Sequence, residues 1–323
     1  MKHLTALAIA ATVASAPVLA QQQQGSIGPA PGRLVDIGGR KLHFICSGSG
    51  APTVVLEAGA GAFAIDWSLV QPAVAQSHRV CSYDRAGAGW SDPRDAVDTP
   101  ARIIRDLHSG LAAAGEETPV VLVGHSMGGV YARLYQLEYP GDVVGLVLVD
   151  PSSEDGLFTL YQGKGVAIAS LSSEQLQTTM PTAPVNVARR SPQTGSPFNL
   201  LPHALYELRV KLEQRVIEAI PLSVPAEVVR EFQAGEHAAL SRLLQSQQQA
   251  DAPIARVPLV VLTRADGNRT AHAILAKLSP NSRHTIVPGA AHEIQLTHPQ
   301  VVIQAIDDVA AAARARKPLP PRP

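Results

Sequence analysis

Short apolar runs rich in β-branched residues alternate with helix-like segments along most of this chain. The runs are PTVVLE (52–57), HRVCSYD (78–84), PVVLVG (119–124), VVGLVLVD (143–150), VPLVVLTR (257–264) and HTIVPG (284–289). Strands that are apolar on both faces are typical of a parallel sheet covered by helices on each side. The alternation therefore predicts an α/β fold with a mostly parallel central sheet flanked by helices.

The alternation has two departures. Residues 33–49 contain two strand-like runs joined at Gly38 and Gly39, which predicts a hairpin. Residues 152–253 carry no strand signal and are helical in pattern, as in LPHALYELRVKLEQRVIEAI (201–220). We expect a helical cap there, inserted into a core that comprises residues 33–151 and 254–316.

The N-terminal segment is patterned as a targeting signal. Lys2 precedes a short apolar run that ends in small residues at Ala20. This pattern predicts a secretory signal peptide over residues 1–20, and the run is too short and too interrupted to favour a bilayer span. Residues 21–32 are interpreted as a linker and 317–323 as a disordered tail. We expect an exported protein, periplasmic or extracellular, with no stable membrane span after cleavage.

The charge balance excludes some partners. The 323 residues include 27 Lys+Arg and 27 Asp+Glu, so the formal net charge is zero. Such a chain has no general attraction for phosphate backbones, and nucleic acid is not an expected partner. There is no H-E-x-x-H motif and no Cys/His cluster with ligand spacing, so no metal or other cofactor is expected. A small molecule is the expected substrate, and the sequence leaves the oligomeric state open.

One serine is enclosed by glycines where a strand pattern meets a helix pattern. The segment GHSMG, Gly124 to Gly128, follows PVVLVG and opens the helical run that reaches Tyr135. A G-x-S-x-G motif in this context predicts a sharp turn that exposes the Ser126 hydroxyl. The following helix directs backbone N–H groups toward developing negative charge. Ser126 is therefore the candidate nucleophile.

A serine nucleophile requires a base and an acid that orients the base. His292 follows the strand-like run HTIVPG and is the candidate base. Asp266, after the run VPLVVLTR, is the preferred acid, and Asp150, at the end of VVGLVLVD, is the alternative. For the oxyanion hole we expect the backbone N–H of Met127 and that of Ala60, with Gly61 as the substitute for Ala60.

The motifs together resemble the α/β-hydrolase superfamily, in its esterase-like form with a helical cap. The similar segments are GHSMGG, YDRAGAGWSD (83–92) and GAAHEIQLTHP (289–299). The resemblance implies strand neighbours that bring Cys46 and Cys81 together, whereas their spacing alone leaves a disulfide and two buried thiols both open. It also implies a structural role for Asp84 and Arg85. One departure is the pair at 58–59, Ala-Gly, where family members commonly carry His-Gly.

The predicted function is that of a serine hydrolase that cleaves a carboxylic ester or related acyl substrate through an acyl-enzyme. Two alternatives come from other classes. A protein of the same fold could bind a ligand with little turnover. The segment VVLEAGAGAFA also fits strand-G-x-G-x-x-A, with Asp84 placed as a ribose-binding acid, which is the pattern of an NAD-dependent oxidoreductase. That pattern leaves Ser126 and His292 unexplained, so the hydrolase is preferred.

Overall fold

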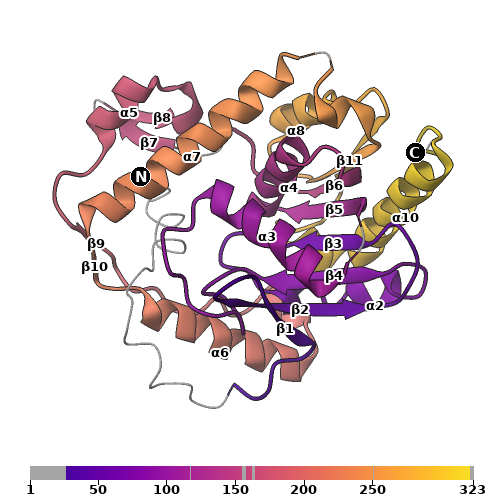
Figure 1. Ribbon diagram of the computed structural model, residues 1–323, viewed down its shortest axis with the longest axis horizontal. Coiled ribbons are helices and arrows are strands. Elements are labelled where there is room, and N and C mark those ends of the chain that lie inside the picture. Colours follow the sequence, from indigo (N-terminus) through magenta and orange to yellow (C-terminus); the bar gives the residue numbers. More distant parts are fainter. Residues whose placement is uncertain (1–26, 117, 155–157, 162–163, 250, 321–323) are drawn as a thin grey trace.

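A computed structural model describes residues 27–116, 118–154, 158–161, 164–249 and 251–320 (Figure 1). Its centre is an eight-stranded sheet of order β1-β2-β4-β3-β5-β6-β11-β12. The strands are β1 (Arg33–Asp36), β2 (Lys41–Ser47), β3 (Val54–Glu57), β4 (Val80–Asp84), β5 (Val120–His125), β6 (Val143–Val149), β11 (Leu259–Arg264) and β12 (Ser282–Val287). β1 and β2 pair antiparallel with their neighbours, and the other pairs are parallel. The predicted fold class and the hairpin at Gly38–Gly39 are confirmed.

Helices cover both faces of the sheet. The core helices are η1 (Ala64–Trp67), α2 (Gln71–Val74), α3 (Pro100–Ala114), α4 (Met127–Glu138), η4 (Pro253–Arg256), α8 (Arg269–Ala276), α9 (Ile294–Thr297) and α10 (Pro299–Ala315). Alternate residues of each central strand enter two separate apolar clusters. Leu122 and Leu146 pack with α3 and α4, whereas Val121 and Val147 pack with α2 and α10. This two-sided burial explains why the strands are continuously apolar in sequence.

The segment between β6 and η4 contains helices, as expected, and also short strands. Its elements are β7 (Phe158–Tyr161), β8 (Lys164–Ala167), η2 (Ile168–Ser170), α5 (Ser173–Thr179), β9 (Val185–Asn186), η3 (Phe198–Leu200), α6 (His203–Ala219), β10 (Ser223–Val224) and α7 (Ala226–Gln247). The expectation that it carries no strand is wrong, because β7 pairs with β8 and β9 with β10. Pairs of two to four residues are too short to leave a periodic signal. Among the described residues, no helix combines the length and apolarity of a membrane span.

The predicted linker and tail are in part ordered against the core. The carbonyl of Pro31 accepts a hydrogen bond from His43 Nε2, and Gly32 lies so close to β2 that a Cβ there would come 2.2 Å from the Phe44 oxygen. At the other end, the backbone N–H of Leu319 donates to Asn281 Oδ1 at 2.8 Å. The described part of the tail thus contacts the core, and the predicted disorder of residues 317–323 stays a prediction. The predicted signal peptide lies outside the described residues and stays a prediction.

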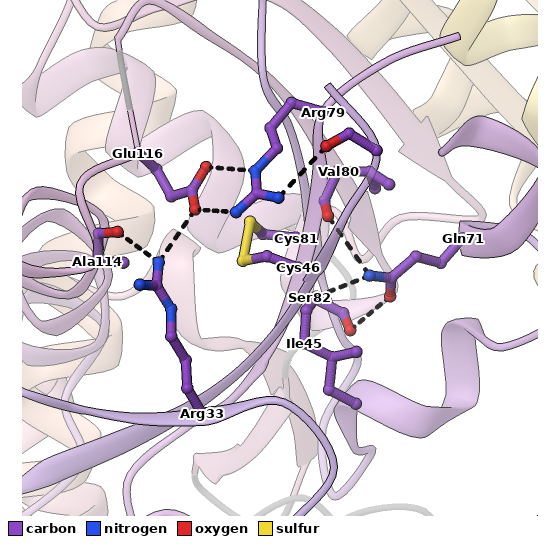
Figure 2. The surroundings of a disulfide bond; sticks show 11 residues. Arg33, Ile45, Cys46, Gln71, Arg79, Val80, Cys81, Ser82, Ala114 and Glu116 are labelled. Atoms are coloured by element: carbon purple, nitrogen blue, oxygen red, sulfur yellow. Dashed lines mark hydrogen bonds and ion pairs between the residues drawn. A yellow bond between two sulfur atoms is a disulfide. The ribbon is translucent and has the colours of Figure 1, made fainter. Parts of the chain in front are cut away.

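Cys46 and Cys81 form a disulfide, which confirms the pairing that the family resemblance implied. They are direct cross-strand partners on β2 and β4, 35 residues apart in sequence. Beside them, Glu116 accepts from Arg79 Nη2 at 2.6 Å and from Arg33 Nη2 at 3.2 Å (Figure 2). The two sulfurs and the Glu116 carboxylate lie within 4.8 Å of one another. Bonded sulfurs are not thiolates and the carboxylate is already paired, so we assign no metal there.

Removing this disulfide should weaken the fold without changing its topology. A cross-link that closes a loop of this length restricts the unfolded chain and contributes about 4 kcal/mol in the chain-entropy model. The variant Cys46→Ala/Cys81→Ala should therefore lose about 2–4 kcal/mol of unfolding free energy in urea titrations. A reductant should lower the stability of the wild type and leave the double variant unchanged. Equal stability of both proteins without reductant would contradict this account.

Candidate active site

Ser126 occupies the turn between β5 and α4 in a strained backbone conformation. Its φ is 52° and its ψ is −122°, and Asp150 is a second non-glycine residue with a positive φ, 39°. Side-chain-bearing residues adopt such angles rarely and at an energetic cost. The backbone N–H of Ser126 donates to the Val149 carbonyl at 3.1 Å, so the serine lies beside the end of β6. The geometry is that of the turn predicted from G-x-S-x-G.

Three glycines crowd this turn because the surrounding backbone leaves no room for a Cβ. A Cβ on Gly124 would come 2.4 Å from the Gly128 oxygen, and one on Gly128 would come 2.4 Å from the Glu57 oxygen. A Cβ on Gly129 would come 2.7 Å from Pro151 Cβ. The glycines thus allow β3, β6 and α4 to meet around the serine.

His292 and Asp150 form a hydrogen-bonded pair next to this turn. Nδ1 of His292 lies 2.6 Å from Oδ2 of Asp150, and the Arg264 N–H donates to Oδ1 at 3.2 Å. The Asp150 carboxylate is 4% exposed. Burial alone would raise the pKa of Asp150, but the hydrogen bond and charge of His292, with the Arg264 N–H, lower it. Asp150 therefore remains ionised at neutral pH and holds the Nδ1–H tautomer of His292.

The structure brings Asp150, and not Asp266, into contact with His292. Asp266 is 82% exposed in the turn after β11, and its Oδ1 lies 3.5 Å from Arg264 Nε. Asp150 follows β6 directly, and its positive φ accompanies a carboxylate directed at the imidazole of His292. Asp266 lies two residues beyond the end of β11, where its side chain is exposed to solvent. The alternative acid of the sequence analysis thus occupies the place expected for Asp266.

A buried polar chain lies behind Asp150, and the sequence analysis missed it. Nε2 of His272 lies 2.7 Å from the Pro151 oxygen, and its Nδ1 lies 2.8 Å from Thr263 Oγ1, which in turn lies 2.8 Å from His284 Nε2. Burial lowers the pKa of both histidines. In their neutral forms every contact has one donor and one acceptor, so the chain fixes Pro151 and the turn that carries Asp150.

His125, inside the GHSMG segment, links the serine turn to the His292 loop. Its Nε2–H donates to the His292 backbone oxygen at 3.0 Å, and the two rings are 4.7 Å apart. Burial, followed by the neighbouring charge of His292, lowers the pKa of His125 to about 3. The ring is therefore neutral under ordinary conditions.

The loop after β3 passes directly over Ser126. A Cβ on Gly59 would come 3.2 Å from Ser126 Cβ, and Ala60 follows at the exposed start of the next turn. Met127 is the first residue of α4 and is 7% exposed. Both predicted oxyanion residues thus belong to segments that border the serine.

Arg85 holds this loop in place through hydrogen bonds to its backbone carbonyls. Its guanidinium donates to the carbonyls of Ala58 (2.7 Å) and Gly59 and to the buried carboxylate of Glu57. Burial raises the pKa of Glu57, and the charge of Arg85 offsets part of that rise. The brace stabilises a loop that lacks the histidine common at position 58 in the similar family.

Asp84 also has a structural place. Its carboxylate is buried, lies 2.7 Å from His43 Nδ1 and accepts the Ala64 N–H at 2.8 Å. A Cβ on Gly89, whose φ is +52°, would come 1.9 Å from its Oδ2. Because these contacts occupy the Asp84 carboxylate on several sides, it is not free to bind the ribose of NAD, as the oxidoreductase pattern would require. The structural role expected for Asp84 agrees with the geometry.

The insertion is joined to the site by a buried ion cluster. Arg209 of α6 donates to Asp66 Oδ1 at 2.9 Å and to Glu213 Oε2 at 2.7 Å, and its side chain is 1% exposed. Burial raises the pKa of Asp66 to about 6, although the Arg209 charge opposes that rise. Asp66 lies in η1, a few residues beyond the loop over Ser126. The insertion and this loop are therefore mechanically connected.

Comparison with known proteins identifies the class. The family model described as "Alpha/beta hydrolase family" matches residues 54–305, and the chain belongs to that family. Uncharacterized protein YqjL of Bacillus subtilis is 24% identical over 277 residues, which are 82% of this chain and 86% of YqjL. The protein efuK of Hormonema carpetanum is 33% identical over 129 residues, 38% of this chain and 18% of efuK.

Two further similarities concern named hydrolases. The 2-hydroxy-6-oxo-6-(2'-aminophenyl)hexa-2,4-dienoic acid hydrolase of Metapseudomonas resinovorans is 35% identical over 99 residues, which are 30% of this chain and 34% of that enzyme. The crystal structure of the enol-lactonase from Burkholderia xenovorans LB400 has a TM-score of 0.59 at 16% identity, and covers 86% of this chain and 100% of its own. At that identity the enol-lactonase shows the shared fold. The family assignment makes this chain a hydrolase-family protein.

The crowding around the turn predicts which glycine substitutions the fold rejects. Gly128→Ala adds a Cβ that meets backbone oxygens of Glu57 and Ala58. This overlap should cost about 1–3 kcal/mol, more than the gain of about 1 kcal/mol from the helix propensity of alanine. Gly141→Ala is the matched control, because a Cβ there has nothing within 4 Å. In urea titrations only Gly128→Ala should lose stability, and equal effects at both positions would contradict the steric explanation.

Proposed function

We propose that this protein is a serine hydrolase that cleaves carboxylic esters, with Ser126 as nucleophile, His292 as base and Asp150 as the acid that orients the base. The observation that carries the proposal is the 2.6 Å contact between His292 Nδ1 and Asp150 Oδ2 beside a serine held at positive φ. With Nδ1 committed to Asp150, Nε2 is the ring nitrogen available to accept the hydroxyl proton.

The proposed reaction proceeds through an acyl-enzyme. The Ser126 hydroxyl oxygen attacks the ester carbonyl carbon while its proton passes to His292 Nε2. The tetrahedral intermediate collapses, the carbon–oxygen bond to the alcohol breaks, and His292 returns the proton to the departing alcohol. Water then attacks the acyl carbon and gives a proton to His292, which returns it to the serine as the carboxylic acid leaves. Asp150 stabilises the imidazolium at each stage by its charge.

The negative charge of the tetrahedral intermediate needs donors that are already in place. The N–H of Met127, at the start of α4, and the N–H of Ala60 are the proposed pair. The brace of Arg85 on the Ala58 and Gly59 carbonyls supports the proposal, because it fixes the loop that carries Ala60. Backbone donors that do not move during the reaction give the largest stabilisation.

The relatives support hydrolysis of an acyl compound. They include an enol-lactonase and a dienoic acid hydrolase. A lactone is a cyclic ester, so a lactonase hydrolyses an ester bond. The second name also describes a hydrolase. On one fold such sites serve several acyl substrates, so the ester class of this chain is a proposal that rests on Ser126, His292 and Asp150.

Two aspartate variants test whether Asp150, rather than Asp266, is the acid that orients His292. Asp150→Asn should lower kcat on an activated ester such as p-nitrophenyl butyrate by about 10⁴-fold, because the amide no longer selects the productive tautomer. Asp266→Asn should retain activity within about twofold, since Asp266 is 82% exposed and its charge is screened by solvent. Both variants should keep the wild-type circular dichroism spectrum. Loss with Asp266→Asn and retention with Asp150→Asn would reverse the assignment.

A further inference from the structure

The inner face of α7 carries two buried polar side chains that the proposed reaction does not use. Gln233 and Glu236 are each 6% exposed, although they lie on a long helix of the insertion. They are three positions apart and so share one face of the helix. The helix α7 packs against α3 and α4 (Figure 1).

Neither side chain is satisfied within the part of the chain that the structure describes. Oε1 of Gln233 is buried without a hydrogen-bond partner. Glu236 has no hydrogen bond or ion pair there, and burial alone raises its pKa to about 7. Buried polar groups are nearly always paired, since an unpaired one loses its hydration without compensation. The buried Gln233 Oε1 and, one turn away, a carboxylate with no described partner point to a ligand that arrives from outside the chain.

Glu236 lies near α4, the helix that begins at the proposed nucleophile. The preceding residue, Gly235, is pressed against Thr99 at the start of α3, where a Cβ would come 2.6 Å from Thr99 Cγ2. The Glu236 charge acts on Tyr131, which lies in α4 five residues after the proposed nucleophile. The Arg85 guanidinium lies 5.5 Å from the Tyr131 ring centre. Glu236 is thus close to the helix that begins at the serine turn and to the residue that braces the oxyanion loop.

Two arginines, one beside α4 and one shortly before α3, are already paired with carboxylates. Arg85 is paired with Glu57, and Arg94 Nε donates to Asp98 Oδ2 at 2.9 Å. Among the described residues, no cation forms an ion pair with Glu236. An occupant that supplies a positive charge with N–H donors would satisfy both the Glu236 carboxylate and the Gln233 oxygen.

We propose that Gln233 and Glu236 form a subsite for an amino group of the substrate, so that the preferred esters carry a primary ammonium on the part that lies beneath α7. This inference rests on the proposed ester hydrolysis for its location in the site. The subsite itself is a property of α7 and can be measured without turnover. The substrate class is therefore amino-substituted esters, and Glu236 is the residue that selects it.

Binding of simple amines tests the subsite independently of catalysis. In isothermal titration calorimetry of the full-length protein, n-hexylammonium should bind at least tenfold more tightly than n-hexanol. Glu236→Gln should abolish this difference, because it removes the charge and retains the shape. Glu231→Gln is the control, since Glu231 is exposed on the same helix, and it should retain the difference. Equal binding of both compounds by the wild type would overturn the proposal.

Turnover gives the second measurement. Methyl ω-aminoalkanoates of graded length should exceed the methyl n-alkanoates of equal length in kcat/KM by at least tenfold at one or more lengths. That ratio should fall to near one in Glu236→Gln and remain in Glu231→Gln. Hydrolysis of both series without preference would reject the subsite and leave the proposed function standing. An absence of any ester hydrolysis would reject the proposed function, and the calorimetry would then decide on the subsite alone.

A purely structural role for Glu236 predicts the opposite effect on stability. A carboxylate that held α7 in place would be partnered, and its replacement would lower the Tm. An unpaired buried carboxyl that is retained for binding should cost stability, so Glu236→Leu should melt at the wild-type temperature or above. A clear drop in Tm together with unchanged amine binding in Glu236→Gln would assign Glu236 to folding.

Discussion

The close approach of three backbone segments around Ser126 is the constraint on which the rest of the site depends. β5 must end, reverse and become α4 within the space left by β3 and β6, and a Cβ on Gly128 would overlap the carbonyl of Glu57. The positive φ of the serine is the consequence of that reversal. Because the turn is this tight, the loop after β3, the start of α4 and the end of β6 all reach the same point. Residues far apart in sequence can therefore act on one atom.

Around this turn the protein fixes each loop by a buried polar contact. Arg85 holds the loop after β3, His125 holds the His292 loop, and the chain that includes His272 holds the turn after Asp150. Each contact is largely withdrawn from water, where a hydrogen bond is stronger and its loss more costly. In the same way, the hydrogen bond from Arg209 to Asp66 joins the insertion to the core. Glu236 differs from these groups because it is buried and unpaired among the described residues, which is why it is assigned to a ligand.

Much of the fold followed from the sequence, because strands buried on both faces and glycine-flanked turns have strong local signatures. Ser126 and His292 were predicted from their places after strands, and the structure puts their loops in contact. The sequence did not distinguish Asp150 from Asp266 as the partner of His292, because both follow a strand. Only the path of the chain shows that Asp150 is directed inward while Asp266 is 82% exposed. The short strands of the insertion and the His272 chain depend on tertiary contacts that no local pattern encodes.

The proposed hydrolysis requires an activated Ser126. The most direct test of that activation is the intact mass of the protein after exposure to a fluorophosphonate. These reagents form a covalent bond with a serine whose hydroxyl proton is removed by a neighbouring base. The wild type should gain the mass of one adduct, and Ser126→Ala should gain none. A folded wild-type protein that remains unlabelled, or an adduct that persists in Ser126→Ala, would contradict the assignment of Ser126 as the nucleophile.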